Sequence, residues 1–145
     1  MNLIKYENLI SNIFNNKVLI SIINLNKLFL YDHTYDEEKK IVFKASNKRK
    51  KEFYGGRIGV KISLKKLGIE NFPVLQDKNR LPIFPKNIYG SISHTKNICI
   101  TAISNNKLFN SIGIDIELNY RLKKKLWNKV LTYEEINWLT SNNFN

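Results

Sequence analysis

The spacing of apolar and polar positions along the chain predicts short strands in two parts of the sequence. Val18–Asn24 and Leu28–Tyr31 are rich in Ile, Leu, Val and Phe, which is typical of strands, and a hairpin is one arrangement for them. Tyr89–Ser93, Ile98–Ser104 and Ile112–Leu118 show the same composition after a loop that contains all three prolines. Helical patterns lie between and after these segments, so the chain is expected to mix helices with strands.

Two helix starts carry recognisable signals. Asp36, Glu37 and Glu38 cluster where a helix is expected to begin, and the helix dipole favours negative charge at that end. The sequence "TYEE" that begins at Thr132 is a capping-box pattern, in which the threonine caps a short helix predicted to end near Leu139.

Between them, a long basic helix is predicted to end at Gly68, where a left-handed backbone costs glycine little. Gly55 and Gly56 lie inside this helix, where each costs about 1 kcal/mol relative to alanine. The pair indicates close approach by another backbone or a ligand; sequence drift explains it equally well. The pattern predicts one apolar face and places the cationic residues, Arg57 among them, on the others; the apolar face consists of Phe53, Ile58, Ile62 and Leu67.

Two acidic residues stand out in the apolar segment "SIGIDIELNYR". Because side chains two positions apart share one face of a strand, Asp115 and Glu117 are predicted to point the same way, with Ile114 and Ile116 toward the core. Neighbouring carboxylates repel unless solvent screens them or a cation lies between them. Oxygen ligands of this kind favour Mg²⁺, which usually takes one or two carboxylates together with substrate phosphates. A solvated strand face is the alternative.

Other residues are suited to binding phosphate. The stretch "GSISHT" places small side chains, two hydroxyls and His94 at a strand end, where free amides could accept a phosphate group. Arg49 and Arg57 are eight residues apart, hence broadly on one side of a helix, and the arginine fork suits phosphate. A structural histidine and a solvated helix face are the alternatives.

Length and charge set limits on these possibilities. A chain of 145 residues with 43% apolar side chains can bury one ordinary core, which favours a single domain or a domain plus a fragment. The net charge of +12 would attract phosphates, nucleic acid, anionic lipid or an acidic protein, although the abundance of Asn, Ile and Lys makes part of the lysine excess compositional.

The single cysteine and the lengths of the apolar runs bear on location. Cys99 is the only cysteine, which excludes an internal disulfide or a multi-cysteine zinc site and suits a reducing compartment. The apolar run "VLISII" is far too short to span a bilayer. We therefore expect a soluble, cytoplasmic protein without a transmembrane segment.

Taken in order, "NKRKKEFYGGR", "LPIFPKNIYGSISHT" and "SIGIDIE" resemble the 4′-phosphopantetheinyl transferases of the surfactin- and enterobactin-synthase type. The resemblance covers Ser46 to about Leu139. Each motif is modest by itself, but the three patterns R-x-x-E-F-x-x-G-R, P-x-x-P with G-S-[IL]-[ST]-H, and G-I-D-x-E in the family's order are specific.

The resemblance implies an enzyme that transfers the phosphopantetheine group from coenzyme A to a serine of an acyl or peptidyl carrier protein, with release of 3′,5′-ADP. Such enzymes serve enterobactin and other siderophore synthesis, nonribosomal peptide, polyketide or fatty-acid synthesis. By the same resemblance, Asp115 and Glu117 are the catalytic metal ligands that hold Mg²⁺ on the pyrophosphate. Coenzyme A is the co-substrate, and its binding residues are Arg49, Arg57, Ser93 and His94.

The family's fold implies the architecture: two similar α+β halves related by a pseudo-twofold axis. Residues 1–110 would be the amino-terminal half with the coenzyme A phosphate motifs, and residues 111–145 the opening strand and helix of the second half. The family's third motif, W-x-x-K-E, falls beyond Asn145, so the chain is expected to be truncated, split or decayed, with impaired transfer. A second departure is Arg80, which stands where the family usually has glycine.

Two rival hypotheses come from other classes. The basic segment "NKRKKEF" with its aromatic neighbours suits a nucleic-acid-binding module, which would leave Asp115 and Glu117 without a role. A decayed fragment without a ligand is the other. The leading hypothesis has no nucleic acid as partner.

Overall fold

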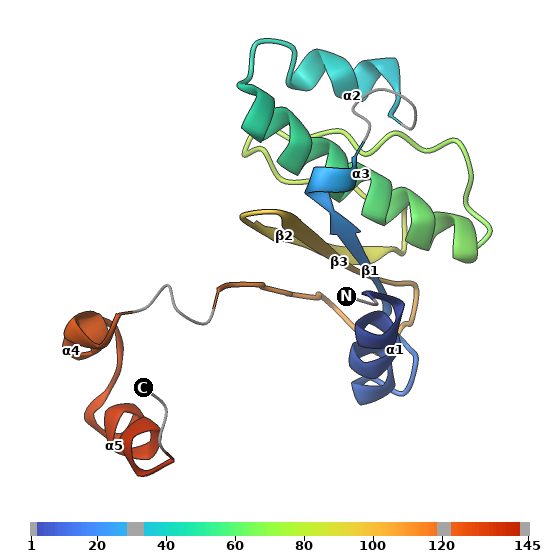
Figure 1. Ribbon diagram of the computed structural model, residues 1–145. Helices are drawn as coiled ribbons and strands as arrows, with labels where there is room; N and C mark the ends of the chain where they lie inside the picture. The colour runs from blue at the N-terminus through green and yellow to red at the C-terminus, as the bar shows by residue number, and fades with distance from the viewer. Residues whose placement is uncertain (1–2, 29–33, 119–122, 143–145) are drawn as a thin grey trace.

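A three-stranded antiparallel sheet forms the centre of the computed structural model, which describes residues 3–28, 34–118 and 123–142. Helix α3 lies on one face of this sheet and α1 on the other (Figure 1), so the predicted α+β class is confirmed. The helices and strands in chain order are α1 Leu3–Ile13, β1 Leu19–Asn24, the 3-10 turn η1 Leu25–Lys27, α2 Asp36–Ile41, α3 Asn47–Lys66, β2 Tyr89–Thr95, β3 Ile98–Ser104, the 3-10 turn η2 Lys124–Leu126, α4 Trp127–Val130 and α5 Tyr133–Ser141.

Strand β3 is the middle strand and pairs antiparallel with both β1 and β2. Three predicted strands are thereby confirmed, and β2 continues two residues beyond the predicted end. In the register, Ile100 lies opposite both Ile22 and Ser93. The hairpin predicted with Leu28–Tyr31 is not formed by Leu28, which follows η1; residues 29–31 lie outside the described part of the chain.

The glycines of α3 allow this helix to lie close to the sheet. A Cβ atom added to Gly55 would lie 2.3 Å from Cδ2 of Leu25, and one added to Gly59 would lie 2.8 Å from Cγ2 of Thr101. Neither separation is possible for real atoms, so a larger residue would force either the neighbouring side chain or the helix to move. The glycine pair is closely approached, as predicted, but the approaching atoms belong to side chains that include Leu25, Cys99 and Ile92 rather than to another backbone or a ligand.

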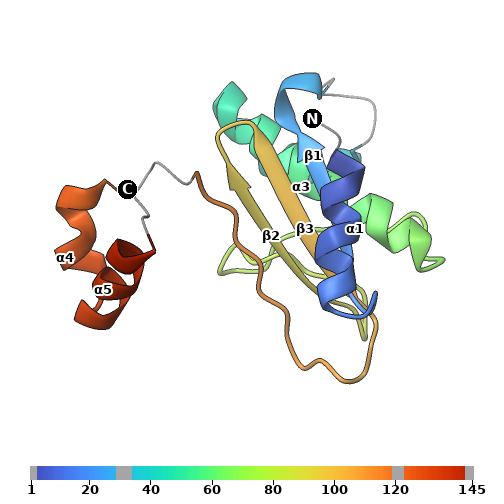
Figure 2. The same cartoon turned by 60° about the horizontal axis from the view of Figure 1, so that its bottom comes forward.

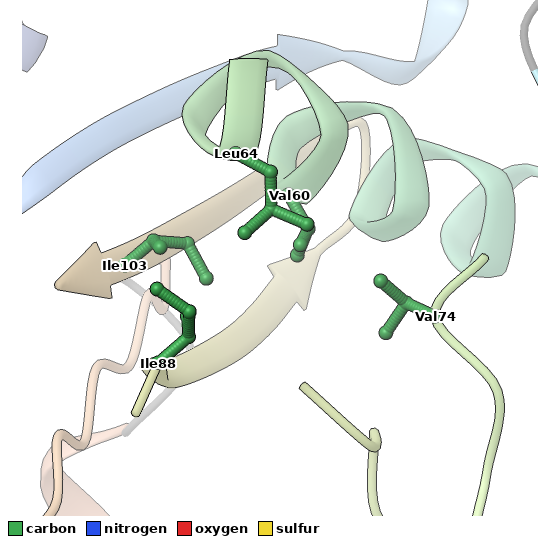
Figure 3. Close-up of a cluster of buried hydrophobic side chains, with 5 residues drawn as sticks. All are labelled: Val60, Leu64, Val74, Ile88 and Ile103. Atoms are coloured by element: carbon green, nitrogen blue, oxygen red, sulfur yellow. The ribbon is translucent and has the colours of Figure 1, made fainter. Parts of the chain in front are cut away.

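The main core lies between α3, the sheet and the loop that follows α3, as Figure 3 shows. The predicted apolar face of α3 is only partly right. Phe53 is buried, whereas Ile62 is 41% exposed. The side of α3 that carries the glycines is the side that packs on the sheet, and Val60 and Leu64 belong to the buried cluster instead. The buried cluster consists of Val60, Leu64, Val74, Ile88 and Ile103.

A second apolar cluster occupies the opposite face of the sheet, where α1 and the segment 111–118 cover it (Figure 2). The prediction of a strand over Ile112–Leu118 is wrong: the segment is extended but joins no strand ladder. Its side chains still alternate, with Ile114 and Ile116 packed on the core. Edge strand β1 is covered in a similar way, because Glu7 Oε1 of α1 accepts a hydrogen bond from Ile22 N at 2.6 Å.

The predicted helix ends agree with the structure. Helix α2 begins with the acidic residues, and Gly68 after α3 has a φ of 75°. Thr132 forms the predicted capping box with Glu135, and α5 continues to Ser141 rather than ending near Leu139. Among the described helices, none is both long and apolar enough to cross a membrane.

Candidate functional site

A cavity of about 510 Å³ opens between α3, β2 and the loops 76–84 and 110–112. Its wall is apolar on the core side, where Phe53, Phe84 and Ile92 contribute. Arginine and histidine side chains from three separate segments meet in the same cavity. The charged and polar residues at its wall that matter below are Arg49, Glu52, Arg57, Arg80 and His94.

Alternation along β2 decides which of its side chains reach the cavity. His94 lies opposite Cys99, on the face covered by α3, whereas Ser93 lies opposite Ile100, whose side chain belongs to the cluster on the other face. Arg49, in the first turn of α3, brings its Nη1 to 3.3 Å from His94 Nε2. Two residues that the sequence places 45 positions apart are thus neighbours at the cavity.

Glu52 lies beneath this pair, one helical turn after Arg49. Its Oε2 is 3.6 Å from Arg49 Nη1 and 3.8 Å from His94 Nε2, and its Oε1 is 3.9 Å from Lys48 Nζ. Only 11% of the Glu52 side chain is exposed, compared with 49% for Arg49. A buried carboxylate therefore supports two groups that face the cavity.

Arg57 lies deeper in the wall and is only 5% exposed. The sequence prediction that placed it among the cations on the polar faces is wrong for this residue. Gly55, Gly56 and Gly59 allow this side of α3 to lie close to the sheet. The guanidinium carbon lies 4.1 Å from the ring centroid of Phe53. Within the described residues, its Nε and Nη2 have no hydrogen-bond partner. Burial lowers the pKa of Arg57 to about 10; the negative charge of Glu38 acts against this shift, and the positive charge of Arg49 adds to it.

Arg80 reaches the cavity from a tight turn whose backbone is left-handed at this residue, with a φ of 65°. Asp77 closes the turn: its Oδ1 accepts hydrogen bonds from the backbone N–H groups of Asn79 and Leu81, each at 2.8 Å. Glycine adopts this backbone at no steric cost, which accounts for the glycine expected at this position. Sequence reasoning treated Arg80 as a departure and assigned it no role in the site.

The remaining predicted residues gather on the opposite face of β2. Ser93 Oγ donates to Asp115 Oδ1 at 2.5 Å, and Thr95 Oγ1 donates to Glu117 Oε1 at 2.8 Å. Both acidic residues are exposed and point the same way, as the alternation predicted. The structure therefore brings Arg49, Arg57 and His94 together at the cavity. It places Ser93 with the carboxylates instead.

Hydroxyl groups of β2 also hold the backbone of the segment that carries these carboxylates. Ser91 Oγ accepts from Ile114 N at 3.2 Å, and Ser93 Oγ accepts from Ile116 N at 3.3 Å. Side-chain bonds thus replace a strand ladder here. In the described part of the chain, no group of three or more His, Cys, Asp or Glu side chains is arranged to hold a metal ion.

Comparison with known protein families gives one match. Residues 37–104 match the 4′-phosphopantetheinyl transferase N-terminal domain. This range contains Arg49, Arg57, Ser93 and His94, and it ends before the two carboxylates.

Similar curated proteins have related names. The 4′-phosphopantetheinyl transferase Npt of Nocardia iowensis is 28% identical over 102 residues, which cover 70% of this chain and 46% of that protein. Enterobactin synthase component D of Salmonella typhimurium is 40% identical over 73 residues, covering 50% of this chain and 29% of that protein. The Escherichia coli K12 protein of the same name is 32% identical, covering 63% and 43%. The chain thus spans less than half the length of these relatives.

Among solved structures, a holo-(acyl-carrier-protein) synthase from Bacillus anthracis in complex with CoA (3′,5′-ADP) has a similar fold. The TM-score is 0.50 with 22% sequence identity, over 60% of this chain and 92% of that chain. At this identity the likeness concerns the fold.

Proposed function

Residues 37–104 match the 4′-phosphopantetheinyl transferase N-terminal domain, and on that premise we propose that the cavity binds the phosphate groups of coenzyme A. The proposed reaction is transfer of the 4′-phosphopantetheine group to a serine of an acyl or peptidyl carrier protein. The serine oxygen forms a bond to the pantetheine-side phosphorus and loses its proton. The anhydride bond breaks, and 3′,5′-ADP leaves.

The observation that carries this proposal is the state of Arg57. A buried guanidinium whose Nε and Nη2 find no hydrogen-bond partner among the described residues is costly, because these two nitrogen atoms have given up their water without gaining a partner. An anion in the cavity would supply the missing hydrogen bonds and add its negative charge to that of Glu38, which already raises the pKa of Arg57. Phosphate suits this fork through paired N–H bonds.

The other cavity residues fit the same ligand. Arg49 and His94 meet at the rim, and Arg80 faces them from the loop, so a polyanionic ligand would be held from several sides. We assign the 3′-phosphate of coenzyme A to the Arg49 and His94 pair. The apolar wall formed by Phe84 and Ile92 suits the flat face of a nucleotide base.

Mg²⁺ is the proposed metal, and Asp115 and Glu117 are its proposed ligands. The donor set fits a hard cation: two exposed carboxylates point the same way, and a hydroxyl bond fixes each of them. When bound, the ion would neutralise charge on the pyrophosphate of a ligand that passes around β2, which is an edge strand of the sheet. Ser93 and Thr95 then orient the two carboxylates rather than touching the nucleotide.

The partner and the domain division belong to the same proposal. The net charge of +12 suits an acidic carrier protein, and the relatives named enterobactin synthase component D support the proposal of an enterobactin-like or other siderophore pathway. Residues 1–110 form the proposed coenzyme A half, and residues 111–145 the start of the second half. The cytoplasmic location also stays a prediction. No comparison supports the nucleic-acid hypothesis, whereas the matched domain supports the transferase.

Calorimetry with coenzyme A and dephospho-coenzyme A tests the binding proposal. Arg57→Ala should weaken the binding of both ligands. His94→Ala should weaken the binding of coenzyme A by about 1.5 to 3 kcal/mol and that of dephospho-coenzyme A much less. Equal losses from His94→Ala would remove the 3′-phosphate assignment. Absence of coenzyme A binding by the unmodified chain would reject the function itself.

A second experiment tests the reaction. The chain is incubated with an apo carrier protein, coenzyme A and Mg²⁺, and the mass of the carrier is followed. We expect binding but slow transfer from these 145 residues, because a metal held by two carboxylates is poorly fixed and displacements of about 1 Å can cost a hundredfold in rate. Rapid and complete addition of phosphopantetheine would show that these two carboxylates suffice.

A further inference from the structure

An acidic residue in the wall of an anion-binding cavity calls for an explanation. Glu52 lowers the positive potential of the cavity, and for attraction of phosphate alone it is unfavourable. It is nevertheless almost fully buried, and its carboxylate oxygens lie near three nitrogen atoms rather than toward solvent. Its position therefore serves the neighbouring groups.

The groups above it need such support. Arg49 Nη1 and His94 Nε2 lie only 3.3 Å apart, and they come from α3 and β2 respectively. When His94 Nε2 accepts from Arg49 Nη1, this contact is a hydrogen bond; when the imidazole is protonated, the two groups repel unless an acceptor lies near both. Glu52 Oε2 lies 3.6 Å from one and 3.8 Å from the other, so one oxygen serves both groups.

The contacts of Glu52 also restrict the directions in which the side chains of Arg49 and His94 point. Arg49 is half exposed and carries a long side chain, which by itself would sample many orientations. Glu52 is fixed on the buried side of α3, one turn after Arg49, and draws both groups toward the floor of the cavity. The outward N–H groups are then left for a ligand at one defined place.

We propose that Glu52 is a positioning and specificity residue, which exchanges general attraction for anions for selective recognition of one phosphate group of the ligand. This inference rests on the proposed function insofar as that phosphate is the 3′-phosphate of coenzyme A. Glu52 itself does not touch the ligand; it acts through Arg49 and His94.

The test uses Glu52→Gln, which removes the charge and keeps the shape, with Glu70→Gln as the control for net charge. Glu70 is exposed and lies outside the cavity wall. Three probes are titrated by calorimetry: coenzyme A, dephospho-coenzyme A and inorganic pyrophosphate. For Glu52→Gln, the ratio of coenzyme A to dephospho-coenzyme A affinity should fall by about tenfold, the scale of one charge-assisted hydrogen bond. Pyrophosphate affinity should rise roughly threefold, because the cavity becomes more positive.

The titrations with the two coenzyme A ligands and the titration with pyrophosphate test the inference and the proposed function separately. If the unmodified chain binds no coenzyme A, the proposed function fails, and the pyrophosphate arm still tests Glu52. An unchanged affinity ratio, or a loss shared equally by all three probes, would overturn the inference, since a purely structural role gives that result. In a His94→Gln background, Glu52→Gln should change the ratio by less than about twofold, because the shared partner is gone.

A variant that keeps the charge guards against loss of folding. Glu52→Asp retains the carboxylate but shortens its reach to Arg49 and His94, so its affinity ratio should lie between those of the unmodified chain and Glu52→Gln. If the Glu52→Asp variant has the same ratio of coenzyme A to dephospho-coenzyme A affinity as the unmodified chain, simultaneous contact with Arg49 and His94 is not required, which contradicts the inference. Circular dichroism on each variant reports whether the fold is intact.

Discussion

Ser93 donates a hydrogen bond to Asp115 at 2.5 Å across a gap of 22 residues, although the two residues belong to no common strand ladder. The same hydroxyl oxygen accepts from Ile116 N, so one small side chain fixes both a carboxylate and the backbone that carries it. His94, the next residue, faces the cavity on the other side of the sheet. Adjacent positions of β2 thus position the two parts of the proposed site.

This relationship gives a first prediction, about the metal. Ser93→Ala should lower the apparent Mg²⁺ affinity, measured as the metal dependence of coenzyme A binding, by about tenfold, the usual scale for losing a group that orients a metal ligand. Ser91→Ala is the matched control, because the Ser91 hydroxyl holds only the backbone of Ile114. Its metal dependence should stay within about twofold. Equal effects of the two substitutions would point to a loosened segment instead.

The carboxylates themselves give a second prediction. Asp115→Asn and Glu117→Gln should each weaken the Mg²⁺-dependent part of coenzyme A binding while leaving metal-free binding and the fold unchanged, since both side chains are exposed and lie outside the cavity wall. Calorimetry with and without a chelator separates the two parts. Unchanged metal dependence in both variants would reject the metal assignment.

A third prediction concerns Cys99, which is fully buried beneath α3. Burial raises the pKa of its thiol to about 12, from an ordinary value of 9.0. The native state therefore keeps a proton that the unfolded state releases above pH 9.0. The resulting stability is fully present below pH 9.0 and is lost as the pH rises toward 12.

Urea unfolding in the presence of a reductant measures this effect. Above pH 9, the unmodified protein should lose about 1.4 kcal/mol per pH unit more than Cys99→Ala does, because only the former has the thiol. Between pH 7 and 8 the difference between the two proteins should stay constant. A pH-independent difference up to pH 10.5 would mean that the thiol titrates equally in both states.

The alternation around Asp115 could be predicted from the sequence because it follows from the period of an extended chain, and the family motifs placed Arg49 and His94 in one predicted binding site without predicting their contact. The burial of Arg57 was not predicted. Glycine adds nothing to an apolar pattern, so Gly55, Gly56 and Gly59, which face the sheet, left no hydropathy signal. The prediction therefore assigned Ile62 to the buried face of α3, although it is exposed. Glu52 was missed for a related reason: a carboxylate three residues after an arginine is also typical of an exposed helix surface.

The close packing of α3 gives a fourth prediction. By helix propensity alone, Gly59→Ala should stabilise the protein by about 1 kcal/mol. The added Cβ would lie 2.8 Å from Cγ2 and 2.9 Å from Oγ1 of Thr101, which is fully buried and stiff about its first side-chain torsion. We expect a net loss of about 1–3 kcal/mol in the free energy of unfolding, the usual scale for overpacking. Lys65→Ala, at an exposed position of the same helix, should change it by less than about 0.5 kcal/mol. A stabilised Gly59→Ala variant would show that the helix can move away freely.

The last prediction separates stability from ligand binding at Arg57. Lowering its pKa from 12.5 to about 10 corresponds to roughly 3 kcal/mol of disfavoured charge in the ligand-free protein. Arg57→Met keeps an apolar side chain of similar length over Phe53 and removes that cost, while losing a cation–π contact of about 1–2 kcal/mol. The ligand-free variant should therefore be more stable by about 1 to 2 kcal/mol in urea unfolding.

In the same variant, coenzyme A should bind at least about tenfold more weakly, and its stabilising effect on unfolding should shrink accordingly. Arg49→Met is the comparison, because Arg49 is half exposed and bears little burial cost. This variant should also bind coenzyme A more weakly, yet its free energy of unfolding without ligand should stay within about 0.5 kcal/mol of that of the unmodified protein. If Arg57→Met instead destabilises the ligand-free protein, Arg57 serves the fold rather than the ligand. The unpaired N–H groups would then have to be satisfied by water within the cavity, and the argument for a bound phosphate would lose its main support.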